Sequence, residues 1–98
     1  MRVAVSGAMG RLGSVIAKGI ANAEDMQLTG VYDPAHPGEV VAGRKIESSV
    51  ESIHADVMVE CTHPDVVMEN LERWHTKGLS VVVGTSGFTA ERIEKVKS

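Results

Sequence analysis

Three glycines near the amino terminus are spaced for binding phosphate. Gly7, Gly10 and Gly13 form a G-x-x-G-x-x-G pattern directly after the apolar run at residues 3–5. The first glycine allows a sharp turn out of a strand, the second lets a pyrophosphate approach the backbone, and the third lets a helix pack closely against the sheet. Free N–H groups at the start of that helix favour an anion. The pattern predicts a loop that binds the pyrophosphate of a dinucleotide, and a tight turn without a ligand is the alternative.

An acidic residue follows at the distance that dinucleotide binding requires. Asp33 comes about 20 residues after Gly13, where an aspartate accepts hydrogen bonds from the adenosine ribose hydroxyls. An acid ahead of Pro34 is also typical of a plain turn. The charge of Asp33 disfavours a 2′-phosphate, whereas Arg11 on the glycine loop favours one. NADH and NADPH therefore both stay open, with a preference for NADH.

The other polar candidates have weaker signals. Thr85 and Ser86, in the Gly-Thr-Ser-Gly segment at residues 84–87, suit contacts to the nicotinamide half of such a ligand, and a plain turn fits equally well. His63 is interpreted as a helix cap in preference to a ligand contact, and Cys61 as an inert core thiol. We predict no metal site and no nucleophile–base pair. Three further histidines share no metal-ligand spacing and are interpreted as surface residues: His36, His54 and His75.

Alternating strands and helices must position these residues. Four apolar runs predict strands at residues 3–5, 28–33, 57–61 and 79–83, with helical periodicity between them. This alternation predicts an α/β fold, a Rossmann-type parallel sheet with helices on both faces. With strands numbered along the chain, we expect the order 2-1-3-4. Ligands of such sheets bind beyond the carboxyl ends of the strands where the winding reverses, here between the first and third strands.

The helices follow from apolar spacing. The first should bury a stripe formed by Leu12, Val15, Ile16, Gly19, Ile20 and Ala23. A second helix opens at Pro64 and ends at Gly78, and its expected buried residues are Val67, Leu71 and Trp74. Thr89 caps a last helix. Residues 34–44 are predicted to form a loop, and residues 49–53 are a candidate helical turn.

Composition limits the class of protein. Ninety-eight residues suit one domain, and 43% hydrophobic residues with 3% aromatic ones indicate a core of aliphatic side chains. A net charge of −3 argues against a nucleic-acid partner. No apolar run approaches the roughly 20 residues of a membrane span. Without a signal-peptide pattern or a disulfide pair, we expect a cytoplasmic protein with no membrane partner.

Three motifs together resemble the N-terminal domain of the dihydrodipicolinate reductase (4-hydroxy-tetrahydrodipicolinate reductase) family. They are V-S-G-A-M-G-R-L-G at residues 5–13, T-H-P-D at 62–65 and V-V-V-G-T-S-G-F-T at 81–89. The short segment at residues 34–55 looks more like the actinobacterial branch. The resemblance implies a reductase of the diaminopimelate route to lysine, which passes hydride from NADH or NADPH to a cyclic unsaturated dicarboxylate.

The resemblance also implies which residues touch the nicotinamide dinucleotide. They are Gly7, Ala8, Met9, Gly10, Arg11, Leu12, Gly13, Asp33, Thr62, Gly84, Thr85 and Ser86. The glycine loop would contact pyrophosphate, Asp33 the adenosine ribose, and residues 84–86 the nicotinamide half. Ser86 stands where the family usually has threonine, which keeps a hydroxyl. Cys61 replaces a common phenylalanine, which loosens packing near the cleft.

The resemblance implies that nucleotide binding and substrate binding belong to two different domains. Residues 1–98 would form a dinucleotide-binding domain that is incomplete relative to the full family domain. The substrate domain, with the catalytic groups and the dicarboxylate site, would follow residue 98, so we expect no catalytic residue and no reductase activity in this chain alone. The full-length family is usually a homotetramer. Two other functions stay open: the cofactor domain of another dehydrogenase, such as a homoserine-type enzyme, and a non-catalytic nucleotide-sensing module.

Overall fold

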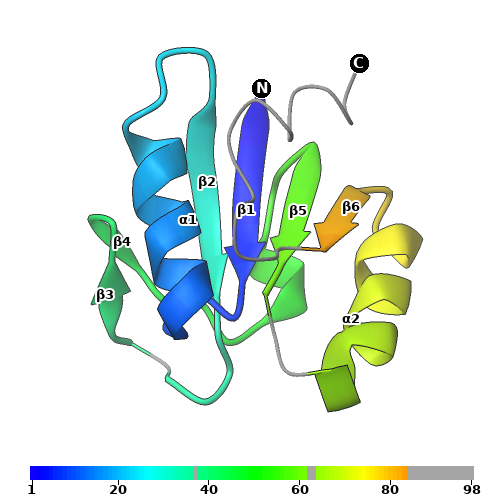
Figure 1. Cartoon of the computed structure of the whole chain (residues 1–98). Helices are drawn as coiled ribbons and strands as arrows, with labels where there is room; N and C mark the ends of the chain where they lie inside the picture. The colour runs from blue at the N-terminus through cyan, green and yellow to red at the C-terminus, as the bar shows by residue number, and fades with distance from the viewer. Residues whose placement is uncertain (37, 62–63, 84–98) are drawn as a thin grey trace.

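The computed structural model describes residues 1–36, 38–61 and 64–83 (Figure 1). Its elements in chain order are β1 (Arg2–Ser6), α1 (Arg11–Ala21), β2 (Gln27–Tyr32), β3 (Val40–Val41), β4 (Arg44–Lys45), the 3-10 turn η1 (Val50–Ser52), β5 (Val57–Glu60), α2 (Pro64–Thr76) and β6 (Ser80–Val83). The last predicted helix, capped by Thr89, lies outside the described residues.

Four parallel strands form the main sheet in the order β2-β1-β5-β6. These are the four predicted strands, so the predicted order is confirmed. Because the strands run in one direction, their carboxyl ends meet at one edge, the lower edge in Figure 1. There Ser6 of β1 pairs with Tyr32 of β2 on one side and with Glu60 of β5 on the other. The winding reverses between β1 and β5, at the centre of this edge.

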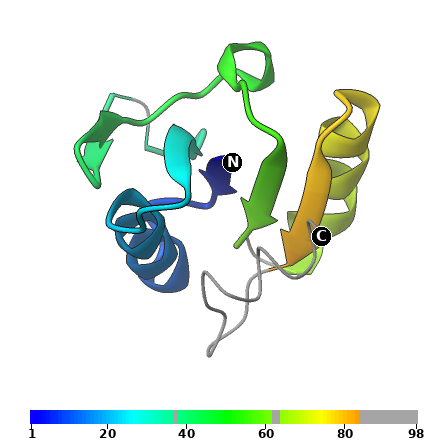
Figure 2. The ribbon, with the colours of Figure 1, turned by 90° about the horizontal axis from the view of Figure 1, so that it is seen from above.

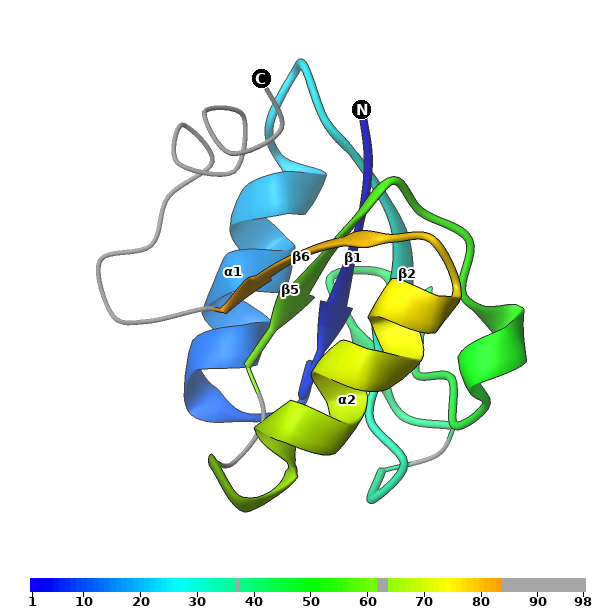
Figure 3. The same ribbon diagram turned by 90° about the vertical axis from the view of Figure 1, so that its right-hand side faces the viewer.

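The sheet has a helix and an apolar core on each face. Side chains alternate across a strand, so β1 contributes Val3 and Val5 to the core that contains the buried residues of α1, and Ala4 to the core that contains Trp74 of α2. The ring of Trp74 also meets the ring of Tyr32 edge to face, with centroids 5.1 Å apart. Figures 2 and 3 show the sheet between α1 and α2, which confirms the predicted layers.

The predicted apolar stripe of α1 is partly wrong. Val15 is 64% exposed and Gly19 is exposed, although both were predicted to face the sheet. The buried residues of the helix are Gly13, Ile16, Ala17 and Ile20. Small residues four positions apart, Gly13 and Ala17, let the helix axis approach the sheet closely. The helix is therefore rotated toward its small-residue side, and Val15 turns to solvent.

The second helix largely agrees with the sequence prediction. It begins at Pro64, and Gly78 beyond its end has a φ of 88°, the left-handed conformation expected of a capping glycine. Trp74 is fully buried and Leu71 is half-buried. The side chain of Val67 lies outside the described part of the chain. Among the described residues, no helix is long and apolar enough to cross a bilayer.

The segment predicted as a loop contains a small hairpin. Strands β3 and β4 pair antiparallel around Ala42 and Gly43, whose φ values are 52° and 78°. Two positive φ values suit the tight turns of hairpins, which usually carry Asn-Gly or Asp-Gly. Ala-Gly is a weaker signal, and for that reason the hairpin was not predicted. Residues 49–53, which the sequence left as a candidate helical turn, contain the 3-10 turn η1.

Two adjacent positions on α1 test the orientation of this helix. Ile16 is 7% exposed, in contrast to the exposed Val15. We expect Ile16→Ala to lower the free energy of unfolding by about 2–4 kcal/mol, because it removes buried methylenes and leaves a cavity. Val15→Ala should change it by less than about 0.5 kcal/mol. Urea denaturation followed by circular dichroism measures both, and a larger loss at Val15 would show that the orientation is wrong.

Candidate functional site

The glycine loop joins β1 to α1 at the carboxyl edge of the sheet. Gly7 has a φ of 75°, in the left-handed region that favours glycine. Its N–H donates to the carbonyl of Tyr32 at 2.8 Å, and the N–H of Gly10 donates back to the carbonyl of Gly7 at 3.0 Å. Gly10 caps α1 and has no side chain to bond the first N–H groups of the helix. Those N–H groups therefore suit an anionic ligand.

The third glycine permits a contact between the helix and the turn. A Cβ at Gly13 would lie 2.1 Å from the carbonyl oxygen of Gly7 and 2.8 Å from its carbonyl carbon. No side chain fits there, because both atoms belong to the backbone. A Cβ at Gly10 would lie 3.3 Å from the same oxygen, which is tight but less severe. The close packing predicted for Gly13 is thus present.

The carboxylate of Asp33 holds the glycine loop to the end of β2. Its Oδ2 accepts a hydrogen bond from the N–H of Met9 at 3.2 Å, and its Oδ1 accepts one from the N–H of Ala35 at 3.2 Å. The side chain is half-buried. Each carboxylate oxygen can accept a further hydrogen bond, so Asp33 can support the loop and still accept from a ligand hydroxyl.

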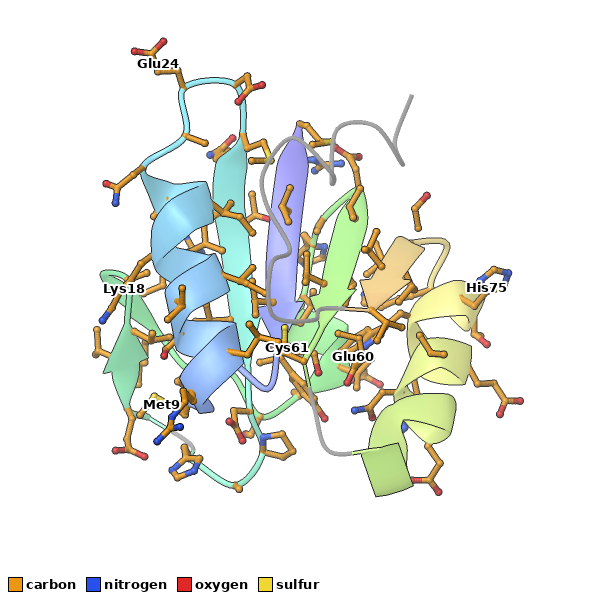
Figure 4. The ribbon with its side chains drawn as sticks, viewed as in Figure 1. Met9, Lys18, Glu24, Glu60, Cys61 and His75 are labelled. Atoms are coloured by element: carbon orange, nitrogen blue, oxygen red, sulfur yellow. The ribbon has the colours of Figure 1, made fainter. Side chains whose placement is uncertain are left out.

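A pocket of about 440 Å³ opens beside this loop. It brings together four of the predicted contact residues, which are Gly7, Met9, Gly10 and Asp33. The other lining residues were not predicted: Pro34, Ala35, His36, Glu69, Asn70 and Arg73, with Cys61 interpreted only as core. Three of these residues, Glu69, Asn70 and Arg73, belong to α2, and the sequence signal that could have found them is that this helix follows β5 at the same edge of the sheet. Figure 4 shows Met9 and Cys61 near this edge.

The other predicted contact residues lie around the pocket or beyond the description. Ala8 is fully buried under the turn, while Arg11 is exposed and Leu12 half-buried at the start of α1. Four predicted contacts lie outside the described residues: Thr62, Gly84, Thr85 and Ser86. The same holds for His63.

The charges around the pocket are mixed. Asp33 and Glu69 are acidic, whereas Arg73 is basic, and Nδ1 of His36 lies 2.8 Å from a carboxylate oxygen of Glu39. Arg11 adds a positive charge at the start of α1. An anionic group is therefore expected to bind at the glycine loop, beside Arg11 and the first N–H groups of α1. A hydroxyl group is expected to donate a hydrogen bond to Asp33.

Cys61 lines the pocket as an unreactive thiol. Burial, and secondly the negative charge of Glu60, raise the pKa of Cys61 to about 12. The thiol therefore stays protonated at neutral pH and is a poor nucleophile. The raised pKa agrees with an inert thiol, but the expected core position is only partly right, because Cys61 is half-buried and borders the pocket.

Metal binding finds no support in the part of the chain that the structure describes. No group of three or more histidine, cysteine, aspartate or glutamate side chains is arranged there to hold a metal ion. The described histidines, His36, His54 and His75, are all exposed, as predicted.

Two larger hollows occur elsewhere on the surface. One of about 820 Å³ lies beside the β3–β4 hairpin, and one of about 680 Å³ lies between η1 and α2. Neither is lined by the glycine loop. The smaller pocket is the candidate site, because ligands of parallel sheets bind beyond the carboxyl ends of the strands.

Comparison with known proteins points to one family. The family model described as dihydrodipicolinate reductase, N-terminus, matches residues 1–98. The 4-hydroxy-tetrahydrodipicolinate reductase of Mycobacterium marinum is 41% identical over 98 residues, which is 100% of this chain and 36% of that protein. The corresponding protein of Corynebacterium diphtheriae is 42% identical over 97 residues, 99% of this chain and 36% of its own length. The chain therefore spans little more than a third of these curated relatives.

A solved structure shows the same fold. The dipicolinate-bound dihydrodipicolinate reductase from Paenisporosarcina sp. TG-14 superposes with a TM-score of 0.71 at 26% sequence identity. The match covers 98% of this chain and 41% of that chain.

Two glycines of α1 give a matched test of the close contact at the loop. Gly13→Ala should lower the free energy of unfolding by about 1–3 kcal/mol, because the new methyl group overlaps the backbone of Gly7. Gly19→Ala meets no atom within 4 Å and should raise it by about 0.5–1 kcal/mol through helix propensity. Thermal denaturation compares the two variants. Equal effects of both substitutions would contradict the contact.

Proposed function

Because the chain belongs to the dihydrodipicolinate reductase family, we propose that residues 1–98 are its dinucleotide-binding domain and that the glycine-loop pocket binds NADH or NADPH. The observation that carries the proposal is the meeting of Gly10, the start of α1 and Asp33 at the point where the sheet reverses its winding. A phosphate requires hydrogen-bond donors, and the N–H groups at the start of α1 supply them. A ribose requires an acceptor for its hydroxyls, and the carboxylate of Asp33 supplies it.

Each part of the ligand has a proposed partner. The pyrophosphate lies against the glycine loop and the first turn of α1, where Gly10 lets it approach the backbone. The adenosine ribose donates its hydroxyls to Asp33. The predicted contacts outside the described residues, Thr62 and residues 84–86, extend the same binding mode toward the nicotinamide half. The pocket fits such a ligand because no side chain at Gly10 fills the space beside the helix terminus.

The chemistry of the whole protein is proposed from the family. The bound dinucleotide supplies hydride, and this chain binds and orients it. The acceptor is a cyclic unsaturated dicarboxylate of the diaminopimelate route to lysine. Its contacts and the proton donor belong to the further length that the relatives have, so no residue of this chain is assigned a catalytic role. The same proposal assigns the protein to the cytoplasm and its full-length form to a homotetramer.

The choice between NADH and NADPH depends on opposing charges. The carboxylate of Asp33 repels a 2′-phosphate on the ribose, and the exposed Arg11 attracts one. We propose that NADH binds more tightly and that Arg11 is responsible for the binding of NADPH.

Other functions differ in what they predict. The family match favours this assignment over a homoserine-type dehydrogenase, which shares the glycine loop. A non-catalytic nucleotide-sensing module would use the same pocket without reducing any dicarboxylate. Reduction of the cyclic dicarboxylate by the protein at its natural length would support the reductase, and its absence despite nucleotide binding would support the sensing module.

Calorimetric titration with NADH and NADPH, each at matched salt, tests the proposed ligand. We expect saturable binding of both, tighter for NADH. Arg11→Ala should weaken NADPH binding about three- to tenfold through the loss of one charge contact, and should change NADH binding by less than about twofold. Lys18→Ala is the control, since it removes an exposed cation from the last turn of the same helix.

The outcomes separate the parts of the proposal. If the folded protein binds neither nucleotide, the proposed function is wrong. If Lys18→Ala weakens NADPH binding as much as Arg11→Ala does, the effect is a long-range one of net charge, and Arg11 does not contact the 2′-phosphate.

A further inference from the structure

A fully buried carboxylate lies beneath the wall of the pocket. Glu60 is the last residue of β5 and is 0% exposed. Its Oε2 accepts hydrogen bonds from Oγ of Ser6 at 3.2 Å and from Nδ2 of Asn70 at 2.9 Å, while its Oε1 accepts one from Nε1 of Trp74 at 2.7 Å. Figure 4 shows Glu60 between the sheet and α2. Several donors thus converge on one buried acidic side chain.

The partners of Glu60 belong to the segments that form the pocket. Ser6 is the last residue of β1 and directly precedes Gly7 of the glycine loop. Asn70, on α2, is 6% exposed and lines the pocket. Trp74 lies one turn further along α2, in the core. One carboxylate therefore connects the strand that leads into the glycine loop with the helix that forms the opposite wall.

The carboxylate also determines the orientation of the Asn70 amide. An asparagine side chain has a donor nitrogen and an acceptor oxygen, whereas a carboxylate only accepts. Nδ2 of Asn70 is therefore turned toward Glu60, and the amide oxygen is directed away from it. Glu60 thus decides which end of this amide faces the rest of the pocket wall.

Packing alone does not explain a glutamate here. Burying a charge is costly, and an apolar side chain of similar volume often gives equal or greater stability. Met58, two residues before Glu60 on the α2 side of the sheet, is apolar and belongs to the same core as Trp74. What the carboxylate adds is a defined set of hydrogen bonds, and hence one arrangement of α2 against β1.

From these contacts we infer that Glu60 is a positioning residue for nucleotide binding. It holds Asn70 and the facing part of α2 in place against the end of β1, so that the pocket is formed before the ligand arrives. Pre-ordering of this kind raises affinity, because the ligand does not have to order the wall itself. The inference rests on the proposed function, since it concerns the same pocket.

Glu60→Gln tests this inference with little change of shape. Nε1 of Trp74 can only donate, so the glutamine oxygen stays with the indole and the glutamine NH2 group faces Asn70. The Asn70 amide must then turn over or lose its partner. We expect the Kd for NADH, measured by calorimetry on the natural-length protein, to rise about tenfold, the loss of one well-formed hydrogen bond. In an Asn70→Ala background, the same change should alter the Kd by less than about twofold, because the positioned group is already absent.

Trp74→Phe is the matched control. It removes the hydrogen bond that the indole N–H donates to the carboxylate and lowers stability, but it leaves Asn70 in place. We expect its Kd for NADH to stay within about twofold of the wild-type value, whereas its free energy of unfolding falls by about 1 kcal/mol or more. A role in stability alone would change the Kd of neither Glu60→Gln nor Trp74→Phe.

The outcomes distinguish this inference from the function on which it rests. No binding of NADH or NADPH by the wild type would overturn both. Normal binding by the wild type and by Glu60→Gln would overturn the inference and leave the function standing. Equal weakening of NADH binding by Glu60→Gln and Trp74→Phe would show that the effect does not depend on the Asn70 amide, and would overturn the inference too. If Glu60→Gln does not fold, the Kd of Asn70→Ala for NADH is the deciding measurement. An unchanged Kd in that variant would show that the Asn70 amide does not contribute to binding, and would overturn the inference.

Discussion

The backbone of α1 lies against the carbonyl of Gly7, and most of the site depends on this contact. It requires a residue without a Cβ at position 13, since a methyl group there would lie 2.1 Å from the Gly7 oxygen. The helix consequently starts directly over the carboxyl edge of the sheet and presents its first N–H groups to the pocket. The same close approach turns Ala17 toward the sheet and Val15 toward solvent.

Two carboxylates then join the remaining segments to this edge. Asp33 links the end of β2 to the glycine loop through the N–H of Met9, and Glu60 links the end of β5 to Ser6 and to α2. Three neighbouring strands and both helices thus converge at the end of β1. A pocket formed by several hydrogen-bonded segments changes little when a ligand enters, which favours affinity. That arrangement suits a domain whose proposed role is to hold a nucleotide in one orientation.

The strands and the glycine turn were predictable because each depends on local signals, and the strand order followed from the alternation of strands and helices. Apolar runs, glycine spacing and Pro64 at a helix start have few alternative meanings. Which side of α1 is buried was not predictable in the same way. Hydrophobicity alone favours burial of Val15 over Ala17, and only the close approach of the helix at Gly13 reverses this preference. Glu60 and Asn70 were missed for a related reason. They contact each other from a strand and from a helix, ten positions apart in the sequence, and periodicity does not reveal such a contact.

The most direct test of the proposed site is a crystal structure of the natural-length protein with NADH bound. The pyrophosphate should lie within hydrogen-bonding distance of the backbone N–H groups of Arg11 and Leu12, and the adenosine ribose should donate to Asp33. The Asn70 amide should keep its hydrogen bond to Glu60 on binding. A nucleotide bound in the hollow beside the β3–β4 hairpin, or away from the glycine loop altogether, would contradict the proposed function.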